Sequence, residues 1–281
     1  MASARIIENK KITTLIYRML LEEERIAREA MPGQFVNLRI GDGYYPLLRR
    51  PMSVHYTDGD RFAILYNVRG IGTNLLSTYR KGDKIDVLGP LGKPFDLPPS
   101  SENLYLIAGG MGIAPLYFLY RKQTANLIMG AKSKNGILPS TEFEGTEKRR
   151  GKREERREKR EDKHGQSARI TDTKYQLLVV TEDGSIGKRG LVTDCLPNVS
   201  DGSTIVACGP IPMLEKVKAF YFHREVTCIL SLEARMGCGY GVCLSCAVKT
   251  KDGYKYVCKD GPAFRAEDVE FDHFTPSPSI S

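Results

Sequence analysis

The 281-residue sequence predicts a multidomain β + α/β protein: an N-terminal Greek-key β-barrel, a Rossmann-like parallel α/β domain and a small cysteine-rich C-terminal domain. Three observations lead to this expectation. Short β-prone runs separated by turns fill the first third of the chain, and a buried strand, a glycine loop and a helix open its middle part. Four cysteines then gather near the C-terminus. We expect the domains at 1–98, 99–224 and 225–281.

The N-terminal region is expected to be all β. Its β-prone runs recur at short and even intervals, with Pro-Gly, Asp-Gly and Lys-Gly-Asp turn signals between them. Evenly spaced short strands with such turns are typical of a small Greek-key barrel. The expected strands are 14–20, 34–40, 52–56, 61–68 and 84–88.

Two stretches of this barrel carry residue types that bind phosphate. In residues 48–53, a proline restricts the backbone, Arg50 can hold a phosphate group and Ser53 offers a hydroxyl. In residues 70–76, two glycines precede a short expected helix. Thr73 stands where an N-cap would, so free amides and the helix dipole could hold a pyrophosphate. Each stretch alone also fits a solvated arginine pair or a plain turn.

The middle of the chain changes to an α/β rhythm. Its first strand is a continuous apolar run, as expected for a strand buried on both faces, and a glycine loop at 109–112 follows at once. A second glycine-bearing turn, at 208–210, follows a later strand. In an open α/β sheet, turns at strand ends hold the ligand. The expected strands are 104–108, 126–131, 176–181 and 204–207, with helices to about 122 and near 213–222.

The C-terminal cysteines follow the spacing C-x4-C-x2-C, with a fourth cysteine after eleven more residues. This spacing is that of plant-type [2Fe–2S] ligands, with two thiolates on each iron. Structural zinc is an alternative, although zinc sites usually bring two C-x2-C pairs, and disulfides fit less well because nothing suggests an oxidising compartment. Glycines between the cysteines allow the backbone to turn sharply around a cluster. The four cysteines are Cys238, Cys243, Cys246 and Cys258, and the glycines are Gly237, Gly239 and Gly241.

Half of the net charge of +8 comes from one short charged segment. Residues 147–163 hold ten Lys or Arg and six Asp or Glu, so we interpret 146–167 as a disordered or helical insertion without a catalytic role. Its interleaved acidic residues argue against nucleic-acid binding. No apolar run approaches the roughly 18 residues of a membrane span, and the N-terminus lacks a signal-peptide core. We therefore expect a cytoplasmic protein that binds neither nucleic acid nor a membrane.

Taken together, these motifs resemble those of a known family. R-P-x-S and G-x-G-T in the barrel, then G-G-x-G-x-A-P-L and C-G-P in the α/β domain, resemble the ferredoxin–NADP reductase superfamily. With the cysteine loop added, nearly the whole chain resembles the electron-transfer subunits of type B, NAD-linked dihydroorotate dehydrogenases. The resemblance implies FAD, NAD and a [2Fe–2S] cluster as cofactors.

The resemblance also implies particular site residues. FAD would be lined by Arg50, Pro51, Met52 and Ser53, with Leu65, Tyr66 and Asn67 at the isoalloxazine and Gly72 and Thr73 at the pyrophosphate. NAD would be bound by Gly110, Gly112, Gly209 and Pro210, with Cys208 as the catalytic residue near the nicotinamide. The cluster ligands would be Cys238, Cys243, Cys246 and Cys258.

The function implied by this resemblance is an electron relay in pyrimidine biosynthesis. A flavin links hydride transfer to one-electron transfer, so FAD is expected between NAD and the cluster. The implied partner is an FMN-containing catalytic subunit that oxidises dihydroorotate, in a heterotetramer of two copies of each subunit. Two alternatives stay open. One is a reductase subunit of a hydrogenase or sulfide dehydrogenase/ferredoxin reductase complex, although related sulfide-type subunits replace the first cysteine with aspartate. The other is a zinc-stabilised regulatory module.

Overall fold

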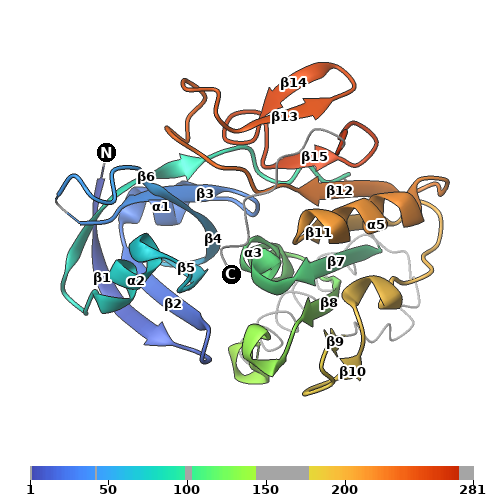
Figure 1. The fold of residues 1–281 in the computed structure, drawn as a ribbon, viewed down its shortest axis with the longest axis horizontal. Helices are drawn as coiled ribbons and strands as arrows, with labels where there is room; N and C mark the ends of the chain where they lie inside the picture. The colour runs from blue at the N-terminus through green and yellow to red at the C-terminus, as the bar shows by residue number, and fades with distance from the viewer. Residues whose placement is uncertain (1, 42, 99–102, 144–176, 272–281) are drawn as a thin grey trace, which may run out of the picture.

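The computed structural model describes residues 2–41, 43–98, 103–143 and 177–271 (Figure 1). The charged insertion expected at 146–167 and the last residues of the chain lie outside the described ranges. Within these ranges, no helix has the length and apolar character needed to cross a bilayer.

The N-terminal part is a closed six-stranded antiparallel barrel with the strand order β1-β2-β5-β4-β3-β6. Two short helices, α1 (Glu24–Glu29) and α2 (Ile71–Thr78), lie between its strands in the chain. The prediction of a β-barrel is confirmed. The strands are β1 (Ala2–Lys11), β2 (Ile16–Glu22), β3 (Phe35–Arg39), β4 (Arg50–Asp58), β5 (Arg61–Asn67) and β6 (Lys84–Leu91).

The strand β1 was not predicted from the sequence. It pairs with both β2 and β6 and so closes the barrel. Only Ala4 and Ile6 of this strand are fully buried; Ala2 and Ile7 are half-buried, and the other six residues are polar or charged. Such a weak apolar pattern does not identify a strand, because here the pairing partners rather than local propensity decide the conformation.

The α/β part is a seven-stranded sheet with the order β10-β9-β8-β7-β11-β12-β15. All neighbouring strands run parallel except β12 and β15, which are antiparallel. The sheet continues past the expected boundary at 224, since β12 and β15 belong to it. Its strands are β7 (Leu104–Gly109), β8 (Asn126–Ala131), β9 (Leu177–Thr181), β10 (Lys188–Arg189), β11 (Thr204–Cys208), β12 (Thr227–Ser231) and β15 (Ala263–Arg265).

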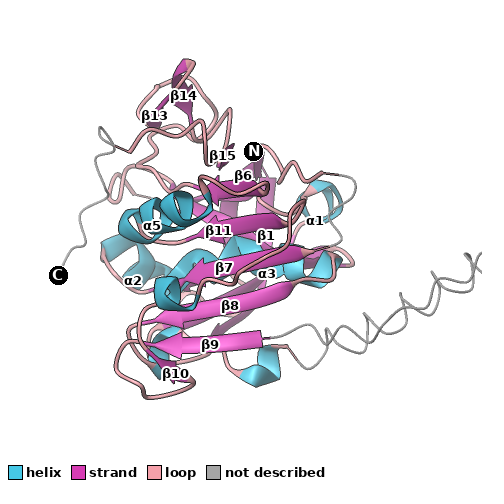
Figure 2. Cartoon of the chain, turned by 90° about the vertical axis from the view of Figure 1, so that its right-hand side faces the viewer, coloured by secondary structure: helices cyan, strands magenta, loops and turns pink. Residues whose placement is uncertain are grey.

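The helices α3 (Ile113–Lys122) and α5 (Ile211–Tyr221) cover opposite faces of this sheet (Figure 2). Leu104, Leu106 and Ala108 of β7 pack on the α3 side, whereas Ile107 packs on the α5 side. The central strand is therefore buried on both faces, which explains its continuous apolar run. Single 3-10 turns lie at Gly110–Gly112, Lys134–Gly136, Ser140–Glu142 and Val192–Cys195.

Helix α3 also lies between the sheet and the barrel, and its contacts hold the two together (Figure 1). Phe118 packs into the barrel core. Buried His55 of β4 donates from Nδ1 to the Ala114 carbonyl at 3.0 Å, and its ring stacks on Tyr117 with 4.3 Å between the centroids. The mutual orientation of barrel and sheet is thus fixed by a buried polar contact as well as by apolar packing.

The cysteine-rich region lies above both layers and contains the hairpin β13 (Ala247–Thr250) and β14 (Gly253–Tyr256) (Figure 1). It is attached to the barrel beyond β6, where the Lys93 amide donates to the Gly261 carbonyl at 2.6 Å. It is attached to the sheet where the Leu232 amide donates to the Pro262 carbonyl at 2.9 Å.

The buried His55 predicts a specific acid sensitivity. Burial lowers the pKa of His55 from 6.5 to about 3, against the opposing effect of its hydrogen bond to the Ala114 carbonyl. The unfolded chain therefore takes up a proton that the folded chain excludes as the pH falls from 6.5 towards 3. The free energy of unfolding therefore falls by up to about 1.4 kcal/mol per pH unit in that window.

We expect His55→Asn to be less stable than wild type at pH 7, because the shorter side chain leaves a cavity beside Tyr117. The difference in unfolding free energy should shrink as the pH falls to 4, and urea titrations at several pH values measure it. His223→Asn, at an exposed histidine after α5, is the control and should keep the wild-type slope. A His55→Asn slope equal to that of wild type would show that His55 is not the group responsible.

Candidate functional site

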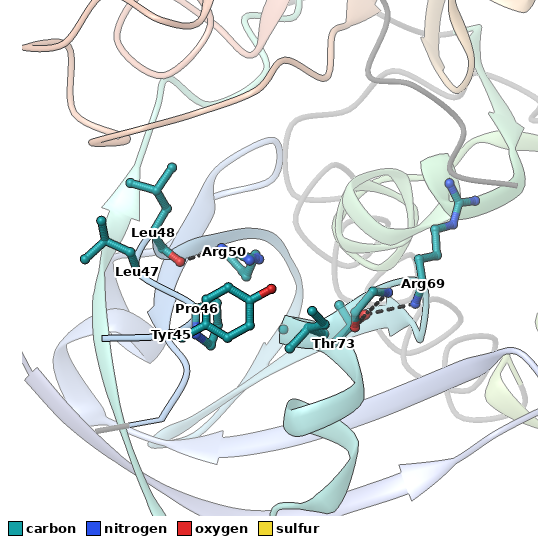
Figure 3. A pocket seen from close by; sticks show the side chains of 10 residues that line it. Tyr45, Pro46, Leu47, Leu48, Arg50, Arg69 and Thr73 are labelled. Carbon is teal, nitrogen blue, oxygen red and sulfur yellow. Dashed lines mark hydrogen bonds between the residues drawn. The ribbon is translucent and has the colours of Figure 1, made fainter. Parts of the chain in front are cut away.

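The two phosphate-binding stretches predicted in the barrel meet in one cavity of about 510 Å³ (Figure 3). One wall comes from the loop before β4 and the other from the N-terminus of α2. The first wall is largely apolar, with Tyr45 and Leu47 widely exposed. The lining residues are Tyr45, Pro46, Leu47, Leu48, Arg50, Arg69, Gly70, Ile71, Gly72 and Thr73.

Arg50 reaches across the cavity to the start of α2. Its guanidinium donates to the Leu48 carbonyl, and a Cβ on Gly72 would lie only 2.8 Å from its Nε atom. A side chain at position 72 would therefore push the Arg50 guanidinium away from the start of the helix. A cation beside a helix N-terminus is suited to bind a phosphate group.

The role expected for Thr73 needs a correction, because it is not the N-cap of α2. The N-cap is Gly70, and Thr73 is the third residue of the helix. Its hydroxyl accepts from the amides of Arg69 at 2.9 Å and Gly70 at 3.2 Å and so orders the turn before the helix. The first amides of the helix lack intrahelical partners and can bind an anion in the cavity.

The other barrel residues expected at FAD are not among the residues that line this cavity. Leu65 is in the core beneath α3, and Tyr66 is buried in the barrel with its hydroxyl donating to Asn9 Oδ1 at 2.8 Å. Neither side chain lines the cavity. Asn67 is half-buried, and its Oδ1 atom has no hydrogen-bond partner among the described residues. Pro51, Met52 and Ser53 follow Arg50 along β4 and are half-buried.

The two glycine turns of the α/β domain are in direct contact, because β7 and β11 are parallel neighbours. A Cβ on Gly112 would lie 1.9 Å from the Cys208 carbonyl oxygen, and one on Gly209 would lie 3.1 Å from the Cα atom of Gly109. Gly110 adopts a φ of +53°, which favours glycine. These turns lie at the carboxyl ends of two neighbouring parallel strands, the place where an open α/β sheet typically binds its ligand. The exposed Pro210 follows at the start of α5.

Cys208, expected near the nicotinamide, is buried at the end of β11. Burial raises the pKa of its thiol, and the neighbouring Glu233 carboxylate raises it further, so the thiol stays protonated. Glu233 is exposed to solvent just after β12, within electrostatic reach of Arg69. Arg69 extends from the rim of the barrel cavity away from Thr73 (Figure 3). Arg69 thus lines the barrel cavity, and Glu233 stands two residues after Ser231, the strand partner of Cys208.

The four cysteines of the C-terminal loop lie as two pairs. The amide of Cys238 donates to Cys243 Sγ at 3.3 Å, and the Cys243 amide donates to Cys238 Sγ at 3.4 Å. The thiols of Cys246 and Cys258 are 3.3 Å apart. The first pair faces the surface, with Cys243 exposed, whereas the second pair is buried.

The loop around the first pair is built to stabilise thiolates. A hydrogen bond from the Ser245 hydroxyl, followed by backbone amides, lowers the pKa of Cys243 to about 6. Burial opposes ionisation of Cys238, but the amides of Cys243, Tyr240 and Val242 lower its pKa overall. Burial raises the pKa of Cys258 to about 12. Metal binding requires thiolates, so these amide donors favour ligation at the exposed pair.

This arrangement fits a two-iron cluster better than a single zinc ion. In the described part of the chain, no three His, Cys, Asp or Glu side chains converge on one point. A zinc site needs four ligands around one ion, whereas a [2Fe–2S] cluster takes two thiolates on each iron. Gly239 and Gly241 have φ values of +83° and +89°, as the sharp turns of the loop require.

Comparisons with known proteins agree with this geometry. The family described as "Iron-sulfur cluster binding domain of dihydroorotate dehydrogenase B" matches residues 233–270. The chain is 35% identical to the dihydroorotate dehydrogenase B (NAD(+)) electron transfer subunit of Bacillus velezensis, over 93% of this chain and 95% of that protein. It is 33% identical to the same subunit of Caldanaerobacter subterraneus subsp. tengcongensis, over 95% and 98%.

Solved structures share the fold. The NADH-dependent reduced ferredoxin-NADP oxidoreductase superposes with a TM-score of 0.74 at 28% identity, over 97% of this chain and 91% of that chain. A ferredoxin NADP+ reductase from Neisseria gonorrhoeae with bound FAD and NADP superposes with a TM-score of 0.61 at 15% identity, over 82% and 98%. The second similarity concerns the fold alone.

Fold and site together define an oxidoreductase subunit of the ferredoxin–NADP reductase type that carries FAD, NAD and a [2Fe–2S] cluster. The chain belongs to the family of dihydroorotate dehydrogenase B (NAD(+)) electron transfer subunits.

Several residues of the site were not predicted from the sequence. Tyr45, Leu47 and Leu48 lie in a loop whose exposed apolar side chains could have indicated a ligand wall. Arg69 and Glu233 carry no local motif, and only the folded chain brings their charges together.

The contact between Arg50 and Gly72 gives a direct test of the flavin cavity. In Gly72→Ala, the new Cβ would displace the guanidinium and weaken FAD binding by ~10-fold or more, about 1.4 kcal/mol, through loss of a charge-assisted contact. FAD content after purification and titration of the flavin-free protein measure this.

Gly70→Ala is the matched control for this variant. Gly70 borders the same cavity in extended backbone, and a Cβ there meets nothing within 4 Å, so FAD binding should be retained. Equal FAD affinity in both variants would contradict the assignment of Arg50 and α2 to FAD.

Proposed function

We propose that this chain is the electron transfer subunit of an NAD-linked dihydroorotate dehydrogenase and passes electrons between NAD and a partner subunit. The observation that carries the proposal is the cysteine loop, in which Cys238 with Cys243 and Cys246 with Cys258 form two thiol pairs. The same fold holds the cavity lined by Arg50 and the two adjacent glycine turns. The family membership supports the same conclusion.

Each part of the chain has a separate task in this proposal. Arg50 and the first amides of α2 hold the FAD pyrophosphate, and the apolar loop before β4 shields the cofactor from water. The adjacent glycine turns hold the nucleotide of NAD, with the protonated Cys208 thiol beneath it. FAD, when bound, exchanges a hydride with NAD and single electrons with the cluster. The four cysteines hold the cluster, and the amides around Cys238 stabilise its negative charge.

The exposed part of the cysteine loop supports a partner surface there. Tyr240, Val242 and Leu244 are exposed apolar side chains around Cys243, and Leu244 adopts a φ of +59°, unusual for a bulky residue. Apolar side chains around an exposed cluster ligand suit docking of another protein. The partner in this proposal is an FMN-containing catalytic subunit that oxidises dihydroorotate, with two copies of each subunit in the complex.

A different partner would define the second candidate function. The similarity to the NADH-dependent reduced ferredoxin-NADP oxidoreductase favours a reductase subunit for another complex. Cysteine rather than aspartate at position 238 favours the dihydroorotate enzyme.

The partner test measures dihydroorotate oxidation with NAD+ by the catalytic subunit alone, by this chain alone and by the two together. We expect activity with NAD+ only when both are present. Cys243→Ser should remove this activity but keep NADH-dependent reduction of a dye through FAD, because it alters one exposed cluster ligand. Cys195→Ser, at a half-buried cysteine outside the ligand spacing, is the control and should keep both activities. No NAD-linked activity in the reconstituted wild-type complex would reject the dihydroorotate partner in favour of another.

A further inference from the structure

A buried asparagine links the barrel to the first cluster ligand. Asn37 lies in the middle of β3 and is fully buried, and its Nδ2 atom donates to the Cys238 carbonyl at 3.1 Å. Its Oδ1 atom has no hydrogen-bond partner within the described ranges. Burying a side-chain amide whose oxygen has no hydrogen-bond partner is unfavourable, and such a residue in a native core calls for an explanation.

The loop is shaped around this amide. A Cβ on Gly239 would lie 2.4 Å from Asn37 Nδ2, so the backbone after Cys238 packs directly on the asparagine. Gly239 also adopts a φ of +83°. The turn that lets the amides of Tyr240 and Val242 point at Cys238 Sγ begins at this contact. Asn37 therefore holds the part of the loop that surrounds the first thiolate.

The same residue is fixed to the strand that borders the flavin cavity. Asn37 pairs across the strands with Pro51 of β4, the residue next to Arg50. Its own carbonyl accepts from the Arg49 guanidinium at 3.3 Å, and Arg49 forms an ion pair with Asp86 of β6 at 2.6 Å. Asn37 is thus held by both strands that neighbour β3 in the barrel, β4 and β6.

We propose that Asn37 is a positioning residue that fixes the Cys238 loop relative to the flavin-binding strand. Its side-chain amide holds the backbone of the loop. The backbone amides that donate to Cys238 Sγ therefore stay in place, and the cluster stays at a fixed distance from the flavin cavity. This inference rests on the proposed function, since it requires a cluster on Cys238. Groups that orient metal ligands typically change metal affinity or activity by about 10- to 100-fold when removed.

The test compares Asn37→Asp and Asn37→Ala with wild type. The aspartate has the size of asparagine but places an oxygen where the donor was, and the alanine removes the donor without adding charge. We expect altered EPR g-values of the reduced cluster, and ~10-fold slower reduction of the cluster by NADH or a similar loss of iron, as for other groups that orient ligands. FAD content and NADH-dependent dye reduction should stay at wild-type values.

Asn9→Asp is the matched control. Asn9 is another barrel asparagine whose amide donates to two carbonyls, those of Leu76 and Tyr79, far from the cysteine loop. It should lower Tm while leaving the EPR signal of the cluster unchanged. The proposal is overturned if both Asn37 variants keep the wild-type EPR signal and cluster reduction rate. It is also overturned if they lose FAD together with iron, because Asn37 would then serve the barrel in general. A wild-type protein without any cluster signal would instead reject the proposed function.

Discussion

Two buried polar side chains on neighbouring strands hold the barrel to the rest of the molecule. Asn37 of β3 bonds to the cysteine loop, and His55 of β4 bonds to the start of α3. Each leaves its other polar atom without a hydrogen-bond partner in the described part of the chain. Each buried polar atom without a hydrogen-bond partner destabilises the fold by about 1–3 kcal/mol. In return, the two side chains make directional hydrogen bonds, which apolar side chains could not provide. The relative positions of the three binding sites depend on these contacts.

Rigid orientation is what an electron relay needs. The flavin cavity, the paired glycine turns and the cysteine loop come from different parts of the chain, and each is built on a strand end or a helix start. The joints between them are specific hydrogen bonds and close packing, such as that of Phe118 in the barrel core. The cysteine pairs also differ in exposure, so that one lies at the surface and the other in the protein interior.

Local sequence patterns predicted the sites better than they predicted how the sites meet. The spacing of Cys238, Cys243, Cys246 and Cys258 is a local signal, because three ligands must come from one short loop. The glycine turns were likewise predictable from the strand, glycine and helix order. The strand β1 was missed because its inward face carries only Ala4 and Ile6. Thr73 was given the wrong position in α2, since glycine can cap a helix without a side chain. Arg69, Glu233 and Asn37 act only through residues distant in sequence, so no local pattern identifies them.

The most direct test of the relay is to add NADH under anaerobic conditions to the purified chain and to follow its visible and EPR spectra together with its metal content. The account predicts a yellow-brown protein that contains iron and FAD. NADH should bleach the flavin bands and the iron–sulfur bands, and the EPR signal of a reduced [2Fe–2S] cluster should appear. A colourless protein that contains zinc and no flavin would contradict the account. So would an FAD- and iron-containing protein whose cluster stays oxidised after NADH has reduced the flavin.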